Sequence, residues 1–147
     1  RIVIQRVSHA SVTIEELQIS IGKGILILVG IEEADGQEDI DWLCKKIVNL
    51  RIFDDENGVM NKSILDIGGD ILVTASSRYM LPPKKGTVFL FKAAKPEISV
   101  PLYEKFCKDL TAALGKEIGT GTFGADMKVE LLNDGPVTIC MDTKNKE

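Results

Sequence analysis

The first thirty residues alternate between apolar and polar positions in the way that β-strands do. Ile2 and Ile4, and then Val12 and Ile14, are each separated by one position, and β-branched side chains dominate this stretch. The run Ile25–Val29 is apolar without alternation, which is typical of a strand buried on both faces. The pattern therefore predicts extended chain here, with Ile25–Val29 as a central strand.

Two later segments change to the period of an amphipathic helix. Within Glu38–Leu50 the apolar residues recur at i, i+3, i+4, i+7 and i+8, and acids precede lysines as the helix dipole favours. The second segment is Val100–Leu114. We predict that Ser99 caps its start, that Pro101 lies in its first turn and that Gly115 ends it.

Glycine and proline divide the rest of the chain into short strands. Gly22–Gly24 predicts a hairpin turn, and Asn133–Pro136 predicts a turn between two strands. The two strands joined by this turn are expected at Lys128–Leu132 and Val137–Met141. Two more strands are expected at Asp70–Thr74 and Thr87–Phe91. Gly119–Gly124 contains Gly-x-Gly, but no helix follows it, as a dinucleotide-binding loop requires. We predict one α+β domain over residues 1–147, with two helices packed on a largely antiparallel, barrel-like β-sheet that can also pair two chains.

Composition and charge narrow the class of protein. Hydrophobic residues make up 44% and charged residues 27%, as in soluble globular proteins. No apolar run could cross a bilayer and no secretory leader pattern opens the chain, so we expect a cytoplasmic protein without a membrane partner. A net charge of −4 argues against a protein that coats nucleic acid. The segment Ile71–Pro96, however, holds five basic residues and no acid, which would suit either a few phosphates or a solvated face.

The inventory of reactive side chains excludes several chemistries. The chain has one histidine, His9, so a multi-histidine zinc site is not possible. Its three cysteines are isolated within apolar patterns and are expected to be buried, reduced thiols: Cys44, Cys107 and Cys140. The acids of Asp54–Glu56 lie on a polar turn, where we expect solvated carboxylates. Catalysis would have to use backbone groups, hydroxyls or the substrate, and we expect no metal and no cofactor.

Five stretches, in order along nearly the whole chain, resemble the D-aminoacyl-tRNA deacylase family. The matching stretches are Gln5–Val12, Lys46–Phe53, Met60–Ser63, Phe123–Met127 and Asn133–Thr138. The resemblance implies a homodimer that hydrolyses the ester of D-aminoacyl-tRNA, with the active site at the subunit interface. Glycyl-tRNA, which has no side chain to exclude, is an expected second substrate.

The resemblance also implies roles for particular residues. Gly135 and Pro136 match a cis dipeptide that enters the partner's pocket and presents carbonyl oxygens to the chiral centre of the substrate. A rigid backbone wall of this kind would exclude an L-amino acid by sterics. Arg6 matches an arginine that supports this turn. Phe123 and Ala125 match positions whose backbone N–H groups stabilise the oxyanion.

Three further residues complete the implied site. Met127 belongs to the pocket-lining segment that begins at Phe123. Lys84 and Lys85 are expected near the phosphates of the tRNA acceptor end.

One block departs from the family pattern. The family carries Ser-Gln-Phe-Thr-Leu after the strand at Asp70–Val73, and this chain has Ala-Ser-Ser-Arg-Tyr at 75–79. Ser76 or Ser77 could supply the missing hydroxyl, without an obvious base. Three explanations stay open: a variant that uses the terminal 2′-hydroxyl of the tRNA, a catalytically impaired tRNA-binding protein of the same fold, or an error in the recorded sequence over 74–90. A dimeric scaffold without a substrate is the least specific reading.

Overall fold

The structure is a computed structural model that describes residues 1–75, 95–123 and 125–144. The elements in chain order are β1 (Ile2–Ile14), β2 (Leu17–Ile21), β3 (Gly24–Val29), α1 (Gln37–Asn49), β4 (Phe53–Asp54), β5 (Met60–Lys62), α2 (Ile64–Ile67), β6 (Asp70–Ala75), α3 (Pro96–Leu114), β7 (Gly119–Thr120) and β8 (Lys128–Met141). The predicted strand at Thr87–Phe91 lies outside the described residues.

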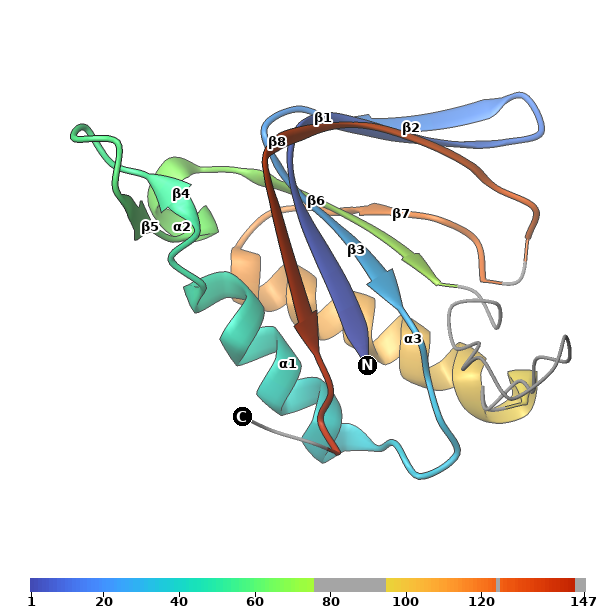
Figure 1. Cartoon of the computed structure of the whole chain (residues 1–147). Coiled ribbons are helices and arrows are strands. Elements are labelled where there is room, and N and C mark those ends of the chain that lie inside the picture. Colours follow the sequence, from blue (N-terminus) through green and yellow to red (C-terminus); the bar gives the residue numbers. More distant parts are fainter. Residues whose placement is uncertain (76–94, 124, 145–147) are drawn as a thin grey trace, which may run out of the picture.

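The long strand β1 organises the sheet. On one side it pairs antiparallel with β3 and then with β2, and on the other side it pairs antiparallel with β8 along most of its length. Beyond β3 the order continues with β6 and β7, both in parallel pairing. The sheet is therefore mixed, and β8 and β7 stand at the two ends of the path β8-β1-β3-β6-β7 (Figure 1).

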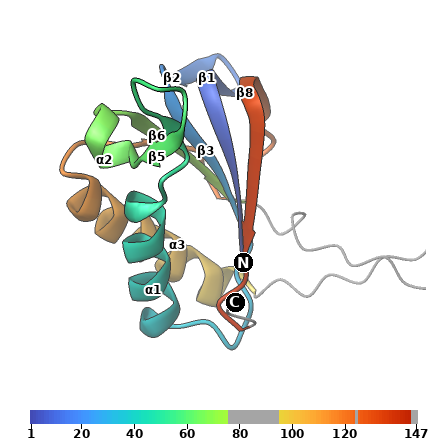
Figure 2. The same cartoon turned by 60° about the vertical axis from the view of Figure 1, so that its left-hand side comes forward.

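The two long helices lie side by side on one face of this sheet (Figures 1 and 2). Their apolar stripes pack on the inward side chains of β1, β3 and β6, including Ile4, Ile27 and Val73, none of which is measurably exposed. Burial of such side chains provides most of the stability of a domain of this size. The predicted α+β class with helices on a barrel-like sheet is confirmed.

A smaller apolar cluster fills the opposite, concave face. Val7, Val12 and Leu72 are its buried centre. On the same side Ile19 in β2 approaches Gly119 in β7 so closely that an added Cβ would lie 3.2 Å from the Ile19 Cγ2 methyl. The sheet thus curls until its two flanks nearly meet, which makes it barrel-like.

Three local predictions need correction, and one helix was not predicted. Gly22–Gly24 is not a hairpin turn, because β2 and β3 continue along the same side of β1 in one unbroken register, and the hairpin lies at Glu15-Glu16 instead. Ser99 is not a helix cap: α3 begins one turn earlier, with Lys95 as N-cap and a proline at its first position, where the missing N–H costs nothing. A short third helix, α2, was not predicted. Asn133–Pro136 does not reverse the chain, as described below.

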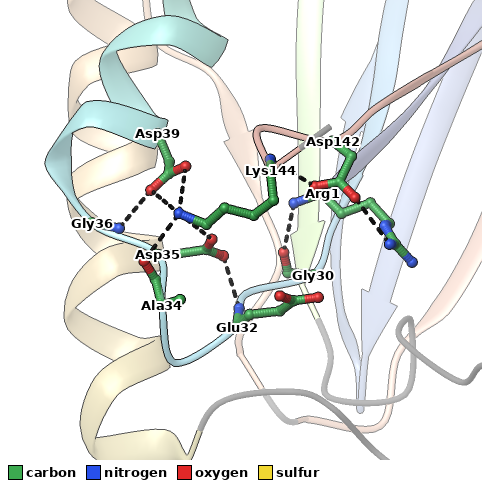
Figure 3. A network of polar contacts seen from close by, with 9 residues as sticks. All are labelled: Arg1, Gly30, Glu32, Ala34, Asp35, Gly36, Asp39, Asp142 and Lys144. Atoms are coloured by element: carbon green, nitrogen blue, oxygen red, sulfur yellow. Dashed lines mark hydrogen bonds and ion pairs between the residues drawn. The ribbon is translucent and has the colours of Figure 1, made fainter. Parts of the chain in front are cut away.

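The residues after β8 hold the start of α1 in place (Figure 3). Lys144 Nζ lies 3.1 Å from both carboxylate oxygens of Asp39 and donates to Ala34 O at 3.0 Å. Asp39 in turn accepts a 2.8 Å hydrogen bond from the N–H of Gly36, the residue that precedes α1. This clasp fixes the C-terminal end of β8 relative to the helical layer.

Among the described ranges, no helix combines the length and the apolar character needed to cross a membrane.

Candidate functional site

The dipeptide Gly135-Pro136 lies in a bulge of the edge strand β8. Gln5 pairs with Thr138 and Val7 pairs with Asn133, so the four residues between them on β8 face Arg6 alone. Both halves of β8 continue antiparallel to β1, and the extra residues loop out of the ladder. The bond between Gly135 and Pro136 is cis, as the resemblance implied, and both residues are exposed. Proline suits this place because the open side of an edge strand needs no N–H donor.

Arg6 braces the bulge from the helix side of the sheet. Its Nε donates to Asp134 O at 2.8 Å, and its Nη1 donates to Ile52 O at 2.7 Å. Two carboxylates, of Asp54 and of Asp134, lie 3.6 Å from the guanidinium and balance its charge. Arg6 is only 7% exposed, and a buried guanidinium is stable only when it is paired in this way. The bulge is therefore tied to the segment that follows α1.

The backbone at Gly135 suits glycine alone. Its φ is +122°, a conformation that side chains with a Cβ rarely adopt. A Cβ built there would lie 2.9 Å from Arg6 Nη2 and 3.2 Å from Val137 N. The arginine thus fills the space that a larger residue would need.

The acidic turn beside this brace is a solvated loop, as the sequence indicated. The Asp55 carboxylate accepts hydrogen bonds from the backbone N–H groups of Val59 and Asn57, and these hold the pKa of Asp55 below its ordinary value. The pKa of Glu56 is also lowered, by its hydrogen bond with Lys62. Carboxyl groups that stay ionised at neutral pH cannot serve as general acids.

The second predicted part of the site is the turn between β7 and β8. Gly121 extends the ladder by donating from its N–H to Val73 O at 2.8 Å, and a turn follows in which Ala125 N–H donates to Thr122 O at 3.2 Å. The ring of Phe123 packs against the ring of Tyr103 at a centroid distance of 6.0 Å. The Ala125 amide, expected as an oxyanion donor, is thus already engaged within the turn.

Met127 serves the packing of this turn. A Cβ at Gly121 would lie 2.5 Å from Met127 Sδ, so the thioether covers the glycine directly. Met127 also packs against the concave apolar cluster. Any contact with a substrate would come from the half-buried remainder of its side chain.

The structure does not bring the two parts together within one chain. Gly135-Pro136 lies on β8, and Phe123 follows β7, at the opposite end of the sheet path. Ser76, Ser77, Lys84 and Lys85 lie outside the described residues. The last described residue before Ser76 is Ala75, the carboxyl end of β6, and β6 adjoins the start of the Phe123 turn.

Sequence reasoning missed three partners of the site residues. Ile52 and Asp54, which complete the brace around Arg6, are distant from Arg6 in the chain, and no local pattern links them. Tyr103 lies within the predicted helix Val100–Leu114 without a predicted role of its own, although a tyrosine on a buried helix face needs a hydrogen-bond partner and could have signalled this contact.

Within the described residues, no group of three or more histidine, cysteine or acidic side chains is placed to hold a metal ion. Cys44 is buried, and burial together with the negative charges of Asp109 and Asp41 raises the pKa of its thiol to about 12. Burial also raises the pKa of the Cys107 thiol to about 11. These two thiols are inert as nucleophiles at neutral pH. We predicted that Cys140 would be buried, but it lies exposed on β8.

Comparison with known proteins gives a consistent result. The sequence model of a family described as D-Tyr-tRNA(Tyr) deacylase matches residues 3–142. A protein of Bacteroides thetaiotaomicron named D-aminoacyl-tRNA deacylase is 79% identical, and the match covers 100% of this chain and 99% of the relative. One of Flavobacterium johnsoniae with the same name is 58% identical with the same coverage.

Two solved structures share the fold. A c-Myc DNA Unwinding Element Binding Protein superposes with a TM-score of 0.88 at 38% identity, covering 97% of each chain. A probable eukaryotic D-amino acid tRNA deacylase superposes with a TM-score of 0.80 at 16% identity, covering 94% of this chain and 96% of the other. At that identity the second likeness concerns the fold alone.

Proposed function

Because the chain belongs to the D-Tyr-tRNA(Tyr) deacylase family, we propose that its active site is assembled from two copies of the chain. The reaction of this enzyme is the hydrolysis of D-aminoacyl-tRNA at the ester that joins the amino acid to the tRNA. One copy would supply the bulge at Gly135-Pro136, and the other would supply the turn at Phe123–Met127.

The separation of these two parts supports a shared site. Each lies at its own end of the sheet path, and the bulge is exposed on the open edge of β8. A homodimer would bring them together twice, because a two-fold interface uses each patch on both subunits.

Exposed apolar side chains on β8 also support pairing. Leu131 is 36% exposed and Leu132 is 52% exposed. Consecutive residues of a strand point to opposite faces, so both faces of β8 are open to solvent at this point. An unpaired edge strand with apolar residues on both faces is a surface that a partner chain would cover.

Chirality would be read by the main chain of the bulge. Carbonyl oxygens near Pro136 would hold the α-amino group and occupy the direction in which an L-residue projects its side chain. A D-residue would project its side chain away from this wall, so one site would accept many D-amino acids. Glycine presents no side chain to exclude, and glycyl-tRNA would be cleaved as well.

Hydrolysis would proceed without a side-chain base. Water adds to the ester carbonyl carbon, the backbone N–H of Phe123 stabilises the resulting oxyanion, and the ester C–O bond then breaks. The ribose hydroxyl leaves with a proton, and the free amino acid is released. The neighbouring ribose hydroxyl of the tRNA is our candidate to activate the water, and Ser76 or Ser77 would supply a hydroxyl in place of the family's threonine. The Ala125 N–H would act as a second oxyanion donor beside the Phe123 N–H only if its hydrogen bond to Thr122 O were broken.

The tRNA acceptor end would approach the same interface. Lys84 and Lys85 would neutralise its phosphates, and we place the reaction in the cytoplasm, where aminoacyl-tRNA is made and used. No organic cofactor is required for this hydrolysis.

The observation that carries the proposal is the bonding of Arg6 to Asp134 O, which holds an exposed glycine-proline bulge ready for a neighbouring chain. The test is incubation with D-tyrosyl-tRNA and L-tyrosyl-tRNA, for the wild type and for Pro136→Ala. We expect release of only the D-amino acid by the wild type, and a larger loss of D/L discrimination than of folding in the variant. No release from either substrate, with tRNA still bound, would favour the catalytically impaired tRNA-binding protein that the altered block at 75–79 suggests.

A further inference from the structure

The turn that carries Phe123 leaves the sheet at Gly121, and two hydrogen bonds fix this point. The Gly121 N–H donates to Val73 O at 2.8 Å, which continues the parallel ladder of β7 with β6. The Gly121 carbonyl oxygen accepts a 2.7 Å hydrogen bond from the hydroxyl of Tyr103 in α3. Both polar groups of this buried glycine are thus bonded, one to the sheet and one to the helical layer.

Tyr103 holds the turn through its ring as well as its hydroxyl. The residue is 5% exposed, and its ring packs in tilted geometry against that of Phe123, two residues beyond Gly121. Aromatic pairs at this distance attract each other beyond the effect of burial alone. One side chain therefore fixes both the start of the turn and the residue whose amide we assign to the oxyanion.

The Tyr103 hydroxyl lies near two backbone carbonyls, that of Val73 in β6 and that of Gly121 just after β7. Val73 O is 3.4 Å from the hydroxyl oxygen, and Gly121 O is closer at 2.7 Å. A phenol has one O–H donor, so its proton is directed at the nearer acceptor, Gly121 O. Loss of the hydroxyl would leave that carbonyl in a buried residue without this donor, and the segment would shift to find another.

We propose that Tyr103 is a positioning residue for catalysis: its hydroxyl and ring set the place of the Phe123 amide relative to the ester carbonyl. This inference rests on the proposed function, since it gives the Phe123 amide its task. Tyr103 itself does not touch the substrate. Misplacement of a catalytic group by about 1 Å is enough to lower a rate by about a hundredfold.

The test is Tyr103→Phe, which keeps the ring and removes only the hydroxyl. We expect kcat for D-tyrosyl-tRNA to fall about tenfold to a hundredfold with KM almost unchanged, and the preference for D over L to persist because the bulge is intact. The matched control is Phe106→Leu, a buried change in the same helix that leaves Tyr103 in place. It should lower the thermal midpoint comparably and leave kcat near that of the wild type. An unchanged kcat in Tyr103→Phe, or an effect on KM alone, would overturn the inference.

A second measurement does not depend on activity. Hydrogen exchange of the backbone amides over 119–123 should accelerate about tenfold in Tyr103→Phe, the change expected from loss of one hydrogen bond, and should stay at the wild-type rate in Phe106→Leu. Equal exchange in both variants would show that the hydroxyl does not position the turn. Accelerated exchange in Tyr103→Phe, together with a wild type that hydrolyses no D-aminoacyl-tRNA, would instead remove the proposed function and retain the tether.

Discussion

Arg6 Nε donates to Asp134 O at 2.8 Å, across the larger of the two register shifts in the pairing of β1 with β8. Arg6 pairs with Ile25 of β3 but has no partner on β8, and the bond links it to the carbonyl that precedes Gly135. The same guanidinium donates to Ile52 O at 2.7 Å. The bulge that we assign to chiral recognition is therefore held by one buried side chain on its inner side, and its outer side is left for a second chain.

Arg6→Lys should lower kcat/KM for D-aminoacyl-tRNA by about tenfold or more, because a charge-assisted hydrogen bond contributes about 1.5–3 kcal/mol. A lysine ammonium is a single point and cannot reach the Asp134 and Ile52 carbonyls with the geometry of a guanidinium fork. Steady-state hydrolysis of D-tyrosyl-tRNA measures the effect.

Arg51→Lys is the matched control for this change. Arg51 also donates to a backbone carbonyl, that of Asn61 at 3.1 Å, but it does so at the surface. Its variant should keep the wild-type activity. Equal activity of both variants would contradict the role assigned to Arg6.

Gly135→Ala should destabilise the fold and reduce hydrolysis together. The φ of +122° and the approach of Arg6 Nη2 leave no relaxed place for a methyl group, and strain of this kind costs about 1–3 kcal/mol. Denaturant unfolding followed by circular dichroism measures the cost. Gly22→Ala, where an added Cβ meets only Asp70 Oδ2 at 3.8 Å, should unfold almost like the wild type, and an equal loss in both variants would count against the strained conformation.

The clasp between Lys144 and Asp39 predicts a pH-dependent contribution to stability. Burial alone would raise the pKa of Asp39, but hydrogen bonds from Gly36 and Lys144 outweigh it and hold that pKa below its ordinary value. A carboxylate with a lowered pKa in the folded state stabilises the fold above its unfolded pKa, near pH 4, and this contribution disappears as the pH falls through the folded pKa.

Asp39→Asn should therefore be less stable than the wild type at pH 7, by about 1 kcal/mol or less, and the difference should close below about pH 4. Urea unfolding at several pH values measures it. Glu33→Gln, an exposed change in the loop that precedes α1, should show no such trend. A gap that persists at low pH would mean that Asp39 acts by its shape and not by its charge.

Much of the architecture could be predicted because it follows from local patterns. The helical period of Glu38–Leu50 gave α1 within one residue, and the apolar run Ile25–Val29 is the strand between β1 and β6. Periodicity records which face a residue buries, and this is the strongest signal that a sequence holds.

The errors arose where pairing across the chain overrides local preference. Gly22–Gly24 and Asn133–Pro136 have turn residues, yet the chain reverses at neither. The first joins β2 and β3 in one register along the same side of β1, and the second is a bulge within β8. The brace of Arg6 could be expected from the family resemblance, but its bond to Ile52 O joins residues that no spacing connects. The tether of Tyr103 to Gly121 is likewise a contact between distant segments.

Dimerisation should depend on the edge strand β8. Leu132→Lys places a charge on an apolar, half-exposed position, and burying an unpaired charge in an interface is unfavourable. Light scattering should give the mass of a dimer for the wild type and shift toward the monomer for the variant, with a matching loss of hydrolysis. A wild type that is monomeric while it hydrolyses D-tyrosyl-tRNA would contradict the shared site.

The most direct test is complementation between two inactive variants. One carries Gly135→Ala with Pro136→Ala and so lacks a working bulge, and the other carries Phe123→Pro and so lacks the backbone N–H of the turn. In a mixed dimer, the intact bulge of one subunit would meet the intact turn of its partner, giving one working site of two. Random reassociation of equal amounts makes half of the dimers mixed, so the account predicts recovery of about a quarter of wild-type D-tyrosyl-tRNA hydrolysis. If the mixture stays as inactive as its two components, while the mixed dimer is shown to form, the site does not span two chains.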